Sequence, residues 1–209
     1  MLKQPEIVWV NGPTGRLETI AIPAQTDTAV GVAVINHPNP TQGGTNTNKV
    51  IQTVAKSLSK QGYHCYLPNL RGVGNSDGVH DYGVGEVEDV LAVIAYAQAA
   101  HPEAAKLTVA GFSFGGYVSA NVAQRVDIDH LIFLAAAMMK YERHAPPVPH
   151  PERVFFVHGN ADDVVELEHT YQWCRPQGIS VMVMPEAGHF FHGRLIELGQ
   201  IIDRYGLCG

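Results

Sequence analysis

Six short apolar segments recur along the chain, and within most of them the apolar residues are consecutive. The segments span residues 29–36, 63–69, 106–112, 130–136, 153–159 and 179–185. Consecutive apolar residues are typical of strands that are covered on both faces, as in a parallel sheet between two layers of helices. Residues 7–23 precede these segments and predict an antiparallel hairpin that turns at residues 12–15, Gly-Pro-Thr-Gly.

Helical patterns lie between the apolar segments. Val50, Val54 and Leu58 repeat every four residues, which is the spacing of one helix face. Further helices are predicted over residues 84–94, 118–122 and 195–202. Strand–helix alternation of this length predicts one α/β domain over residues 1–209, doubly wound around a mostly parallel central sheet.

Residues 137–152 show neither pattern and contain prolines at positions 146, 147, 149 and 151. Proline is excluded from helix interiors and from central strands. We therefore expect an ordered loop here and no helical lid domain.

Composition excludes several classes of protein. The 209 residues carry a net charge of -6 and no basic face is evident, which argues against nucleic-acid binding. The longest apolar run, residues 131–139, is too short to cross a bilayer, and the first twelve residues lack a signal-peptide core. The cysteines, Cys65, Cys174 and Cys208, are odd in number and widely spaced, which predicts reduced thiols. We expect a cytoplasmic monomer or homodimer with no membrane partner.

Ser113 lies in the segment Gly111-Phe112-Ser113-Phe114-Gly115, which follows an apolar strand pattern and precedes a helical one. Gly-x-Ser-x-Gly in this context predicts a sharp turn that raises the serine above the end of the sheet. Glycine is needed on both sides because a side chain there would clash with the neighbouring strand and helix. The alternative is an ordinary strand–helix turn. We interpret Ser113 as a nucleophile at a helix N-terminus.

A serine nucleophile needs a base and an acid, which in this arrangement follow two late strands in the order acid, then histidine. Asp162 and Asp163 follow the strand pattern at residues 153–159, and each is also suited to capping a helix that begins near residue 164 or 165. His189 follows the last strand pattern and a glycine, and it is the candidate base. His192 is the local competitor, although it is also suited to capping the C-terminal helix or lining the pocket.

An oxyanion hole requires two backbone N–H donors. One is predicted at Phe114, the residue after the serine, and the other in the loop after residues 29–36. Pro38 and Pro40 have no N–H group, so Asn39 is the first candidate and Thr41 the second. The alternative interpretation of this loop is a proline-rich surface turn.

Two glycine-rich segments do not indicate nucleotide binding. Gly43-Gly44 lacks the Gly-Lys-Ser/Thr sequence of a phosphate-binding loop, and residues 71–78 lack the Gly-x-Gly-x-x-Gly pattern. We interpret residues 71–78 as a tight turn in which Arg71 binds nearby backbone or acids. Acidic residues are also expected in the first turns of the next helix, where its N-terminus favours negative charge.

Together these segments resemble the α/β-hydrolase superfamily over nearly the whole chain. The matching segments are residues 37–38 with 43–44, 71–78, 111–116, 158–165 and 187–193. Within the superfamily the chain is similar to small lidless bacterial hydrolases of the dienelactone-hydrolase-like and short-chain esterase branches. Members carry His-Gly-x-x-Asp after the penultimate core strand, which implies that Asp162 is the acid, with Ser113 as the nucleophile and His189 as the base.

The expected function is therefore a serine hydrolase that cleaves small or short-chain carboxylic esters without a metal or organic cofactor. A peptidase or thioesterase with the same triad, and a non-catalytic binding protein on the same fold, are the alternatives. Phe114, Tyr117, Phe190 and Phe191 are candidates for the rim of the pocket, whereas Phe112 is expected to pack against the sheet.

Overall fold

The computed structural model describes residues 4–207, and within them one sheet contains eight strands. The strands are β1 (Glu6–Gly12), β2 (Gly15–Ile22), β3 (Gly31–Asn36), β4 (Tyr63–Pro68), β5 (Lys106–Phe112), β6 (His130–Leu134), β7 (Val154–Gly159) and β8 (Val181–Met184). Their order in the sheet is β1-β2-β4-β3-β5-β6-β7-β8. The strands β1 and β2 form an antiparallel hairpin, and β2 pairs with β4 in antiparallel fashion. The other six strands, β3 to β8, run parallel to one another.

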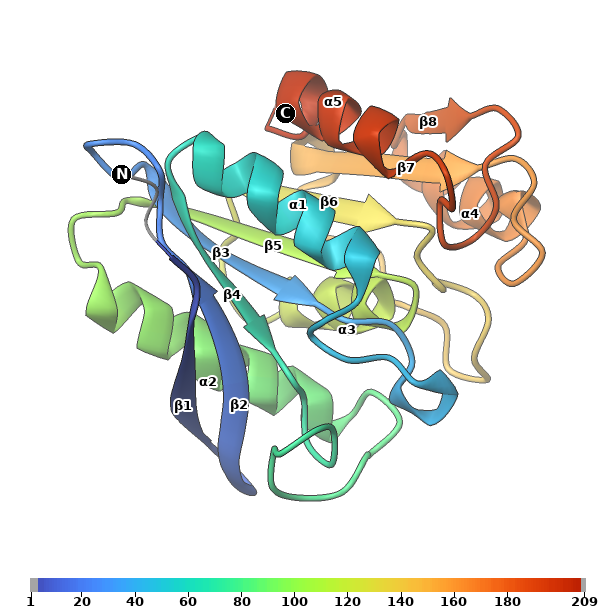
Figure 1. The fold of residues 1–209 in the computed structure, drawn as a ribbon. Helices are drawn as coiled ribbons and strands as arrows, with labels where there is room; N and C mark the ends of the chain where they lie inside the picture. Colours follow the sequence, from blue (N-terminus) through green and yellow to red (C-terminus); the bar gives the residue numbers. More distant parts are fainter. Residues whose placement is uncertain (1–3, 208–209) are drawn as a thin grey trace.

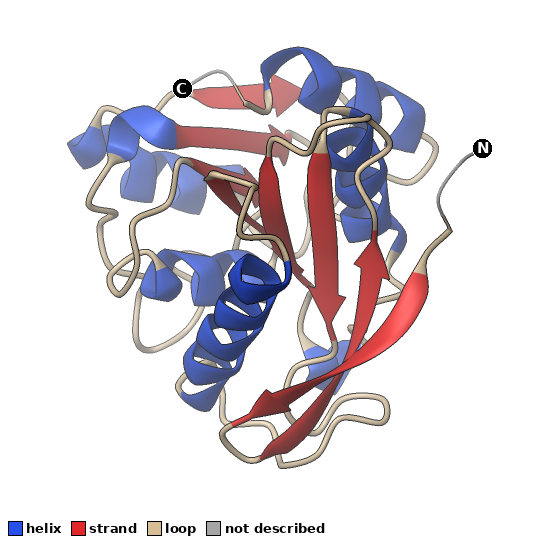
Figure 2. Ribbon diagram, turned by 90° about the vertical axis from the view of Figure 1, so that its left-hand side faces the viewer, coloured by secondary structure: helices blue, strands red, loops and turns tan. Residues whose placement is uncertain are grey.

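Helices cover both faces of the sheet (Figures 1 and 2). They are α1 (Lys49–Lys60), α2 (Gly85–Ala100), α3 (Phe114–Val122), α4 (Leu167–Cys174) and α5 (Leu195–Tyr205). The apolar residues of α1 and α5 share one core cluster with one face of the sheet, and those of α2, α3 and α4 share a second cluster with the other. The predicted doubly wound α/β fold with an N-terminal hairpin is confirmed.

Strand β3 shows why the central strands are apolar without alternation. All six of its residues are buried, because it pairs with β4 and β5 and is covered on both faces. Each buried face removes apolar surface from water, which is the main favourable term in folding. Parallel pairing also brings the carboxyl ends of β3 through β8 to one edge of the sheet, and the candidate residues lie in the loops at that edge.

The segment between β6 and β7 contains turns and bends but no α-helix from residue 135 to residue 150. A short 3-10 turn, Pro151–Arg153, then leads into β7. The expectation of a proline-rich loop without a lid domain is confirmed. No helix in residues 4–207 is both long and apolar enough to cross a bilayer.

Two of the three cysteines lie in the core. Cys65 and Cys174 are buried free thiols, and burial raises the pKa of the Cys174 thiol to about 12. Both are reduced, as predicted. Cys208 lies outside the described residues.

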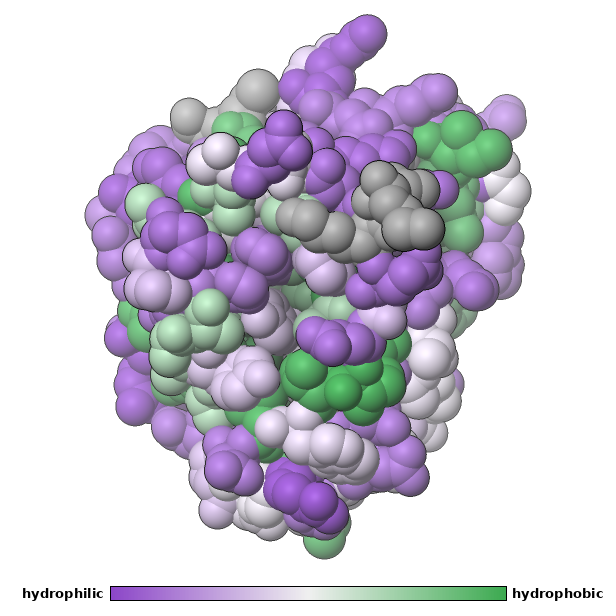
Figure 3. All heavy atoms as spheres, turned by 60° about the vertical axis from the view of Figure 1, so that its left-hand side comes forward, coloured by the Kyte–Doolittle hydropathy of each residue, from purple (hydrophilic) through white to green (hydrophobic). Residues whose placement is uncertain are grey.

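A surface groove of about 540 Å³ lies beside the N-terminal hairpin and is lined by residues of β1, β2, α1 and Leu195. Figure 3 shows a hydrophobic patch surrounded by hydrophilic residues when this side of the molecule is turned forward. The groove contains none of the candidate catalytic residues, which lie in the loops after β3, β5, β7 and β8.

Candidate active site

Ser113 occupies a strained turn between β5 and α3. Its φ angle is 53° and its ψ angle is -116°, so a non-glycine residue adopts a backbone conformation that L-residues rarely occupy. The Ser113 N–H donates to Leu134 O (3.0 Å), and Ser113 O accepts from Ala137 N (3.0 Å), so the end of β6 holds the turn in place. Strain of this kind persists only where surrounding structure enforces it, and it is concentrated at functional sites.

The glycines around Ser113 allow three backbone segments to pack together. A Cβ at Gly111 would lie 2.2 Å from Gly115 O, and a Cβ at Gly115 would lie 2.3 Å from Asn36 O. A Cβ at Gly116 would lie 2.3 Å from the Ala136 Cβ. These distances give the physical reason for glycine on both sides of the serine, because the start of α3 packs directly on the ends of β3 and β6.

Replacing Gly115 by alanine is expected to destabilise the fold by about 3 kcal/mol, at the upper end of typical overpacking costs. The new methyl group meets the backbone oxygens of Asn36 and His37, at 2.3 and 2.7 Å, and neither can move without displacing the end of β3. Urea unfolding followed by circular dichroism measures the change. Gly199→Ala on α5 is the matched control: its Cβ would make only ordinary contacts with Thr53 and Ser57 of α1, so its stability should be equal to or above that of the parent. Equal stability of the two variants would contradict the packing argument.

His189 and Asp162 form a hydrogen-bonded pair at the edge of the sheet. His189 Nδ1 lies 2.8 Å from Asp162 Oδ2, and both side chains are almost fully buried. The His189 ring also packs on Phe112, the residue before Ser113, with ring centroids 4.9 Å apart. No hydrogen bond joins the His189 ring to the Ser113 hydroxyl in the described structure. Such contacts are often long in free enzymes and tighten when substrate binds.

Asp162 is held by hydrogen bonds to both of its oxygens. Oδ1 accepts from the backbone N–H groups of Val164 (2.9 Å) and Val165 (2.8 Å). Oδ2 accepts from His189 and lies 3.2 Å from His158 Nε2. Burial by itself would raise the pKa of this carboxyl, but the hydrogen bonds from His158, His189 and Val165 hold the pKa well below its usual range. Asp162 is therefore ionised at neutral pH and fixes a proton on Nδ1 of His189.

The structure distinguishes the two local alternatives. Asp163 is exposed and makes no hydrogen bond or ion pair with any described residue. The prediction that α4 begins near residue 164 was wrong: α4 begins at Leu167, because Asp162 binds the N–H groups of residues 164 and 165 in a turn before it. His192 is exposed, stacks on Phe190, and does not cap α5, whose N-cap residue is Arg194.

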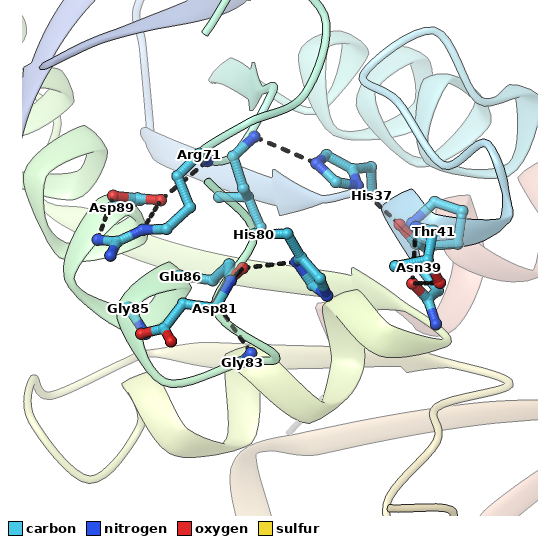
Figure 4. A network of polar contacts seen from close by, with 12 residues as sticks. His37, Asn39, Thr41, Arg71, His80, Asp81, Gly83, Gly85, Glu86 and Asp89 are labelled. Atoms are coloured by element: carbon cyan, nitrogen blue, oxygen red, sulfur yellow. Dashed lines mark hydrogen bonds and ion pairs between the residues drawn. The ribbon is translucent and has the colours of Figure 1, made fainter. Parts of the chain in front are cut away.

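The two predicted oxyanion donors lie at the start of α3 and in the loop after β3. Phe114 is the first residue of α3, where N–H groups have no partner within the helix. In the loop after β3, the Thr41 N–H already donates to Asn39 Oδ1 (2.9 Å), as Figure 4 shows. The Asn39 N–H has no partner among the described residues. This difference favours Asn39 over Thr41.

The sequence matches the family model described as alpha/beta hydrolase fold over residues 34–152. The chain belongs to the alpha/beta hydrolase fold family. The structure of XC6422 from Xanthomonas campestris, described as an a/b serine hydrolase without lid, is similar to it at 32% identity and a TM-score of 0.89, over 98% of this chain and 94% of that one. An alpha-beta serine hydrolase homologue from Coxiella burnetii is 36% identical, with a TM-score of 0.83 over 98% and 97% of the two chains.

The esterase Pf2001 from Pyrococcus furiosus shares the fold at 18% identity and a TM-score of 0.73, over 96% of this chain and 92% of that one. Membership in the alpha/beta hydrolase family and the likeness to serine hydrolases without a lid support hydrolase activity for this chain.

His37 anchors the candidate oxyanion loop of this alpha/beta hydrolase. It is fully buried, its Nδ1 lies 2.7 Å from Pro38 O, and its Nε2 accepts from Leu70 N (3.1 Å). Burial lowers the pKa of His37 to about 4, so the ring is neutral at physiological pH and carries its proton on Nδ1. The neutral ring ties the loop after β3 to the loop after β4.

His37 predicts a specific acid sensitivity. Its pKa falls from an ordinary 6.5 to about 4, so between these values the unfolded chain binds a proton that the folded chain does not. The free energy of unfolding is expected to fall by about 3 kcal/mol from this residue alone as pH drops through that window. Urea unfolding between about pH 7.5 and 4.5 measures it. His37→Gln should show a shallower decline, and an unchanged slope would contradict this role. Asp162 contributes only at lower pH, because its pKa is depressed from an ordinary 3.8.

Of the aromatic residues predicted at the rim of the pocket, one is exposed and the others are buried. Phe190 is 42% exposed and packs against both Phe112 and His189, so it lies at the surface beside the catalytic histidine candidate. Phe114, Tyr117 and Phe191, the other candidates for the rim of the pocket, are buried and pack within the fold. Phe114 and Tyr117 instead stack beneath the loops that cover α3, whereas Phe112 packs within the core as expected.

The loop after β4 and the first turns of α2 contain charged groups that the sequence did not assign to the site (Figure 4). Arg71 forms a bidentate pair with the buried Asp89, at 2.9 and 2.8 Å, which confirms the prediction that Arg71 binds nearby acids. Glu86 is fully buried and accepts the N–H groups of Asp81 and Gly83. In the sequence Glu86 is simply an acid in the first turn of a helix, and no local signal shows that it faces inward.

One group of described residues has ligand atoms close enough to hold a metal ion: His64, His101 and Glu103. The two imidazole rings are stacked, with centroids 3.6 Å apart and planes inclined by 11°, so their in-plane lone pairs do not converge on one point. His101 Nε2 also bonds to the Tyr66 hydroxyl at 2.9 Å. These residues contact none of the candidate catalytic side chains, and we assign them no role in the reaction.

Proposed function

We propose that the protein is a serine hydrolase that cleaves small or short-chain carboxylic esters through Ser113, His189 and Asp162. The observation that carries this proposal is the strained serine at the N-terminus of α3, whose preceding residue, Phe112, packs on the ring of His189 in the buried His189–Asp162 pair. A serine hydroxyl is a weak nucleophile alone, and a histidine oriented by a carboxylate is the usual means of activating it.

In the proposed reaction, Ser113 Oγ attacks the ester carbonyl while His189 Nε2 takes the serine proton. The oxyanion accepts hydrogen bonds from the N–H groups of Phe114 and Asn39. The protonated His189 then gives its proton to the departing alkoxy oxygen, which leaves an acyl-enzyme. Water, deprotonated by His189, attacks the acyl-enzyme, and His189 then returns the proton to Ser113 Oγ as the acid leaves. Asp162 keeps the proton of His189 on Nδ1 throughout and stabilises the charged ring.

The absence of a helix between residues 135 and 150 supports small substrates, because no lid domain encloses a long apolar channel above the described site. Thioester or amide cleavage with the same residues is the alternative, and substrate profiling separates these activities.

A fluorophosphonate reagent tests the proposal directly. It reacts with activated serines, and peptide mapping by mass spectrometry should place the adduct on Ser113. The adduct should be lost in His189→Ala, because without the base the hydroxyl is not activated. A folded protein that forms no adduct and hydrolyses no short-chain ester would overturn the proposal and favour a binding protein on the same fold.

A further inference from the structure

A second histidine–carboxylate pair lies on the opposite side of Ser113 from His189. The sheet order places the end of β5, which leads to Ser113, between the end of β4 on one side and the ends of β7 and β8 on the other. His80 belongs to the loop after β4, whereas Asp162 and His189 follow β7 and β8. The ring of His80 packs edge-on against Phe114, with ring centroids 5.3 Å apart. His80 therefore lies beside the residue that follows the candidate nucleophile.

Glu86 fixes the position of His80. His80 Nδ1 lies 2.7 Å from Glu86 Oε1, a close contact whose angle does not meet the geometry of a hydrogen bond. Glu86 has no exposed surface, and it also accepts N–H groups at 2.7 Å and 2.8 Å from Asp81 and Gly83, in the same loop. A buried carboxylate that accepts two backbone N–H groups of one loop and lies against a side-chain nitrogen of the same loop leaves that loop little freedom.

Phe114 and Tyr117 support the same loop from below. A Cβ at Gly83 would lie 2.6 Å from the Tyr117 ring, so the loop backbone packs directly on α3. His80 also contributes, after burial, to lowering the pKa of His37, the residue whose Nδ1 lies against Pro38 O at the start of the Asn39 loop. His80 is thus bounded by the two segments that carry the candidate oxyanion donors.

The second ring nitrogen of His80 is directed away from Glu86. Figure 4 shows Nε2 on the side of the ring that faces α3 and the Asn39 loop. The side chain keeps 14% of its surface exposed, and Nε2 has no partner among the described residues. In the neutral ring Nε2 carries either a lone pair or an N–H group, according to the tautomer, and in the charged ring it carries an N–H group.

We propose that His80 Nε2 binds a hydroxyl group on the acyl part of the ester substrate. A hydroxyl is the group that fits both states of the ring, since it donates to the lone pair and accepts from the N–H. The acyl part is indicated by the positions of the two histidines. The departing alkoxy oxygen must face His189 to receive its proton, so the acyl chain extends on the side of His80. This inference rests on the proposed esterase function.

Matched esters test the proposal. Methyl 3-hydroxybutyrate and methyl 3-methylbutyrate differ by a hydroxyl in place of a methyl group, and both enantiomers of the hydroxy ester should be assayed. The parent protein should hydrolyse one hydroxy enantiomer with a kcat/KM about tenfold above that of the methyl analogue, the scale of one good hydrogen bond. A second pair, 2-hydroxyethyl butyrate and propyl butyrate, places the same change on the alcohol side and should show no such preference.

The variant His80→Phe keeps the aromatic contact with Phe114 and removes both ring nitrogens. It should lose the preference for the hydroxy acyl ester while still hydrolysing methyl butyrate. The preference is a ratio within one protein sample, so partial unfolding does not change it. His192→Phe is the matched control, because His192 is an exposed imidazole near the same edge of the sheet, beside Phe190. It should keep the preference.

The outcomes separate this inference from the proposed function. If Ser113 is labelled by a fluorophosphonate but the parent shows no preference for the hydroxy acyl ester, the assignment of His80 is wrong and the esterase stands. If His80→Phe keeps the preference, His80 is not the recognition residue. If monomethyl succinate is preferred instead, and increasingly so at acidic pH, the ring binds a carboxylate and the hydroxyl assignment is overturned. Loss of the Ser113 adduct would remove both proposals.

Discussion

Replacing Ser113 by alanine is expected to reduce the hydrolysis of short-chain p-nitrophenyl esters by about a millionfold, which in practice is the background rate. The substitution removes the attacking oxygen and leaves the turn otherwise intact, since the backbone bonds of residue 113 to Leu134 and Ala137 remain. His189→Ala should cause a loss of the same size. The double variant should be no slower than either single variant, because the two residues act as one unit.

Circular dichroism and urea unfolding serve as the controls for the serine variant. Its stability should equal or exceed that of the parent, because the substitution removes only a hydroxyl group at a strained position and no contact that stabilises the core. A folded Ser113→Ala protein that keeps a substantial part of the ester hydrolysis would show that the reaction uses another nucleophile.

The fold is the part that the sequence predicts well, because hydrophobic patterning alone determines which segments are covered on two faces. The run at residues 106–112 became β5 with the same bounds, and the four prolines after residue 145 excluded a helical lid as expected. The sharp turn at Ser113 was also predicted from a local signal, since the flanking glycines leave room for the backbone contacts of the turn.

The residues that the sequence did not reveal are those whose roles depend on distant partners. His158 appears in the sequence only as part of a His-Gly pair. In the structure its Nε2 donates to Val165 O (2.9 Å) and lies beside Asp162, while Thr170 bonds to its Nδ1. The inward orientation of Glu86 likewise depends on the path of the loop after β4. No local pattern separates such a buried histidine or glutamate from one that is solvated.

Replacing Asp162 by asparagine is expected to lower kcat by about ten-thousandfold while leaving the fold intact. The reason lies in the four nitrogens around this side chain, which are the backbone nitrogens of Val164 and Val165, His189 Nδ1 and His158 Nε2. The backbone N–H groups of Val164 and Val165 require an oxygen at Oδ1, so the asparagine must place its NH₂ group toward His189. That NH₂ group donates to Nδ1, which moves the ring proton to Nε2. The base then faces Ser113 with a proton already bound and cannot accept another.

Asp163→Asn is the matched control for this prediction, and it tests the alternative that the neighbouring acid serves the histidine. Asp163 is exposed and bonds to no described residue, so its substitution should leave kcat within about twofold and stability within about 0.5 kcal/mol. Initial rates with one short-chain ester, measured for both variants and the parent at the same pH, give the comparison. If Asp163→Asn were the slower variant, the acid would be misassigned. If both variants kept the parent rate, neither acid would serve the reaction. The buried contact between His189 and Asp162 would then have only a structural role.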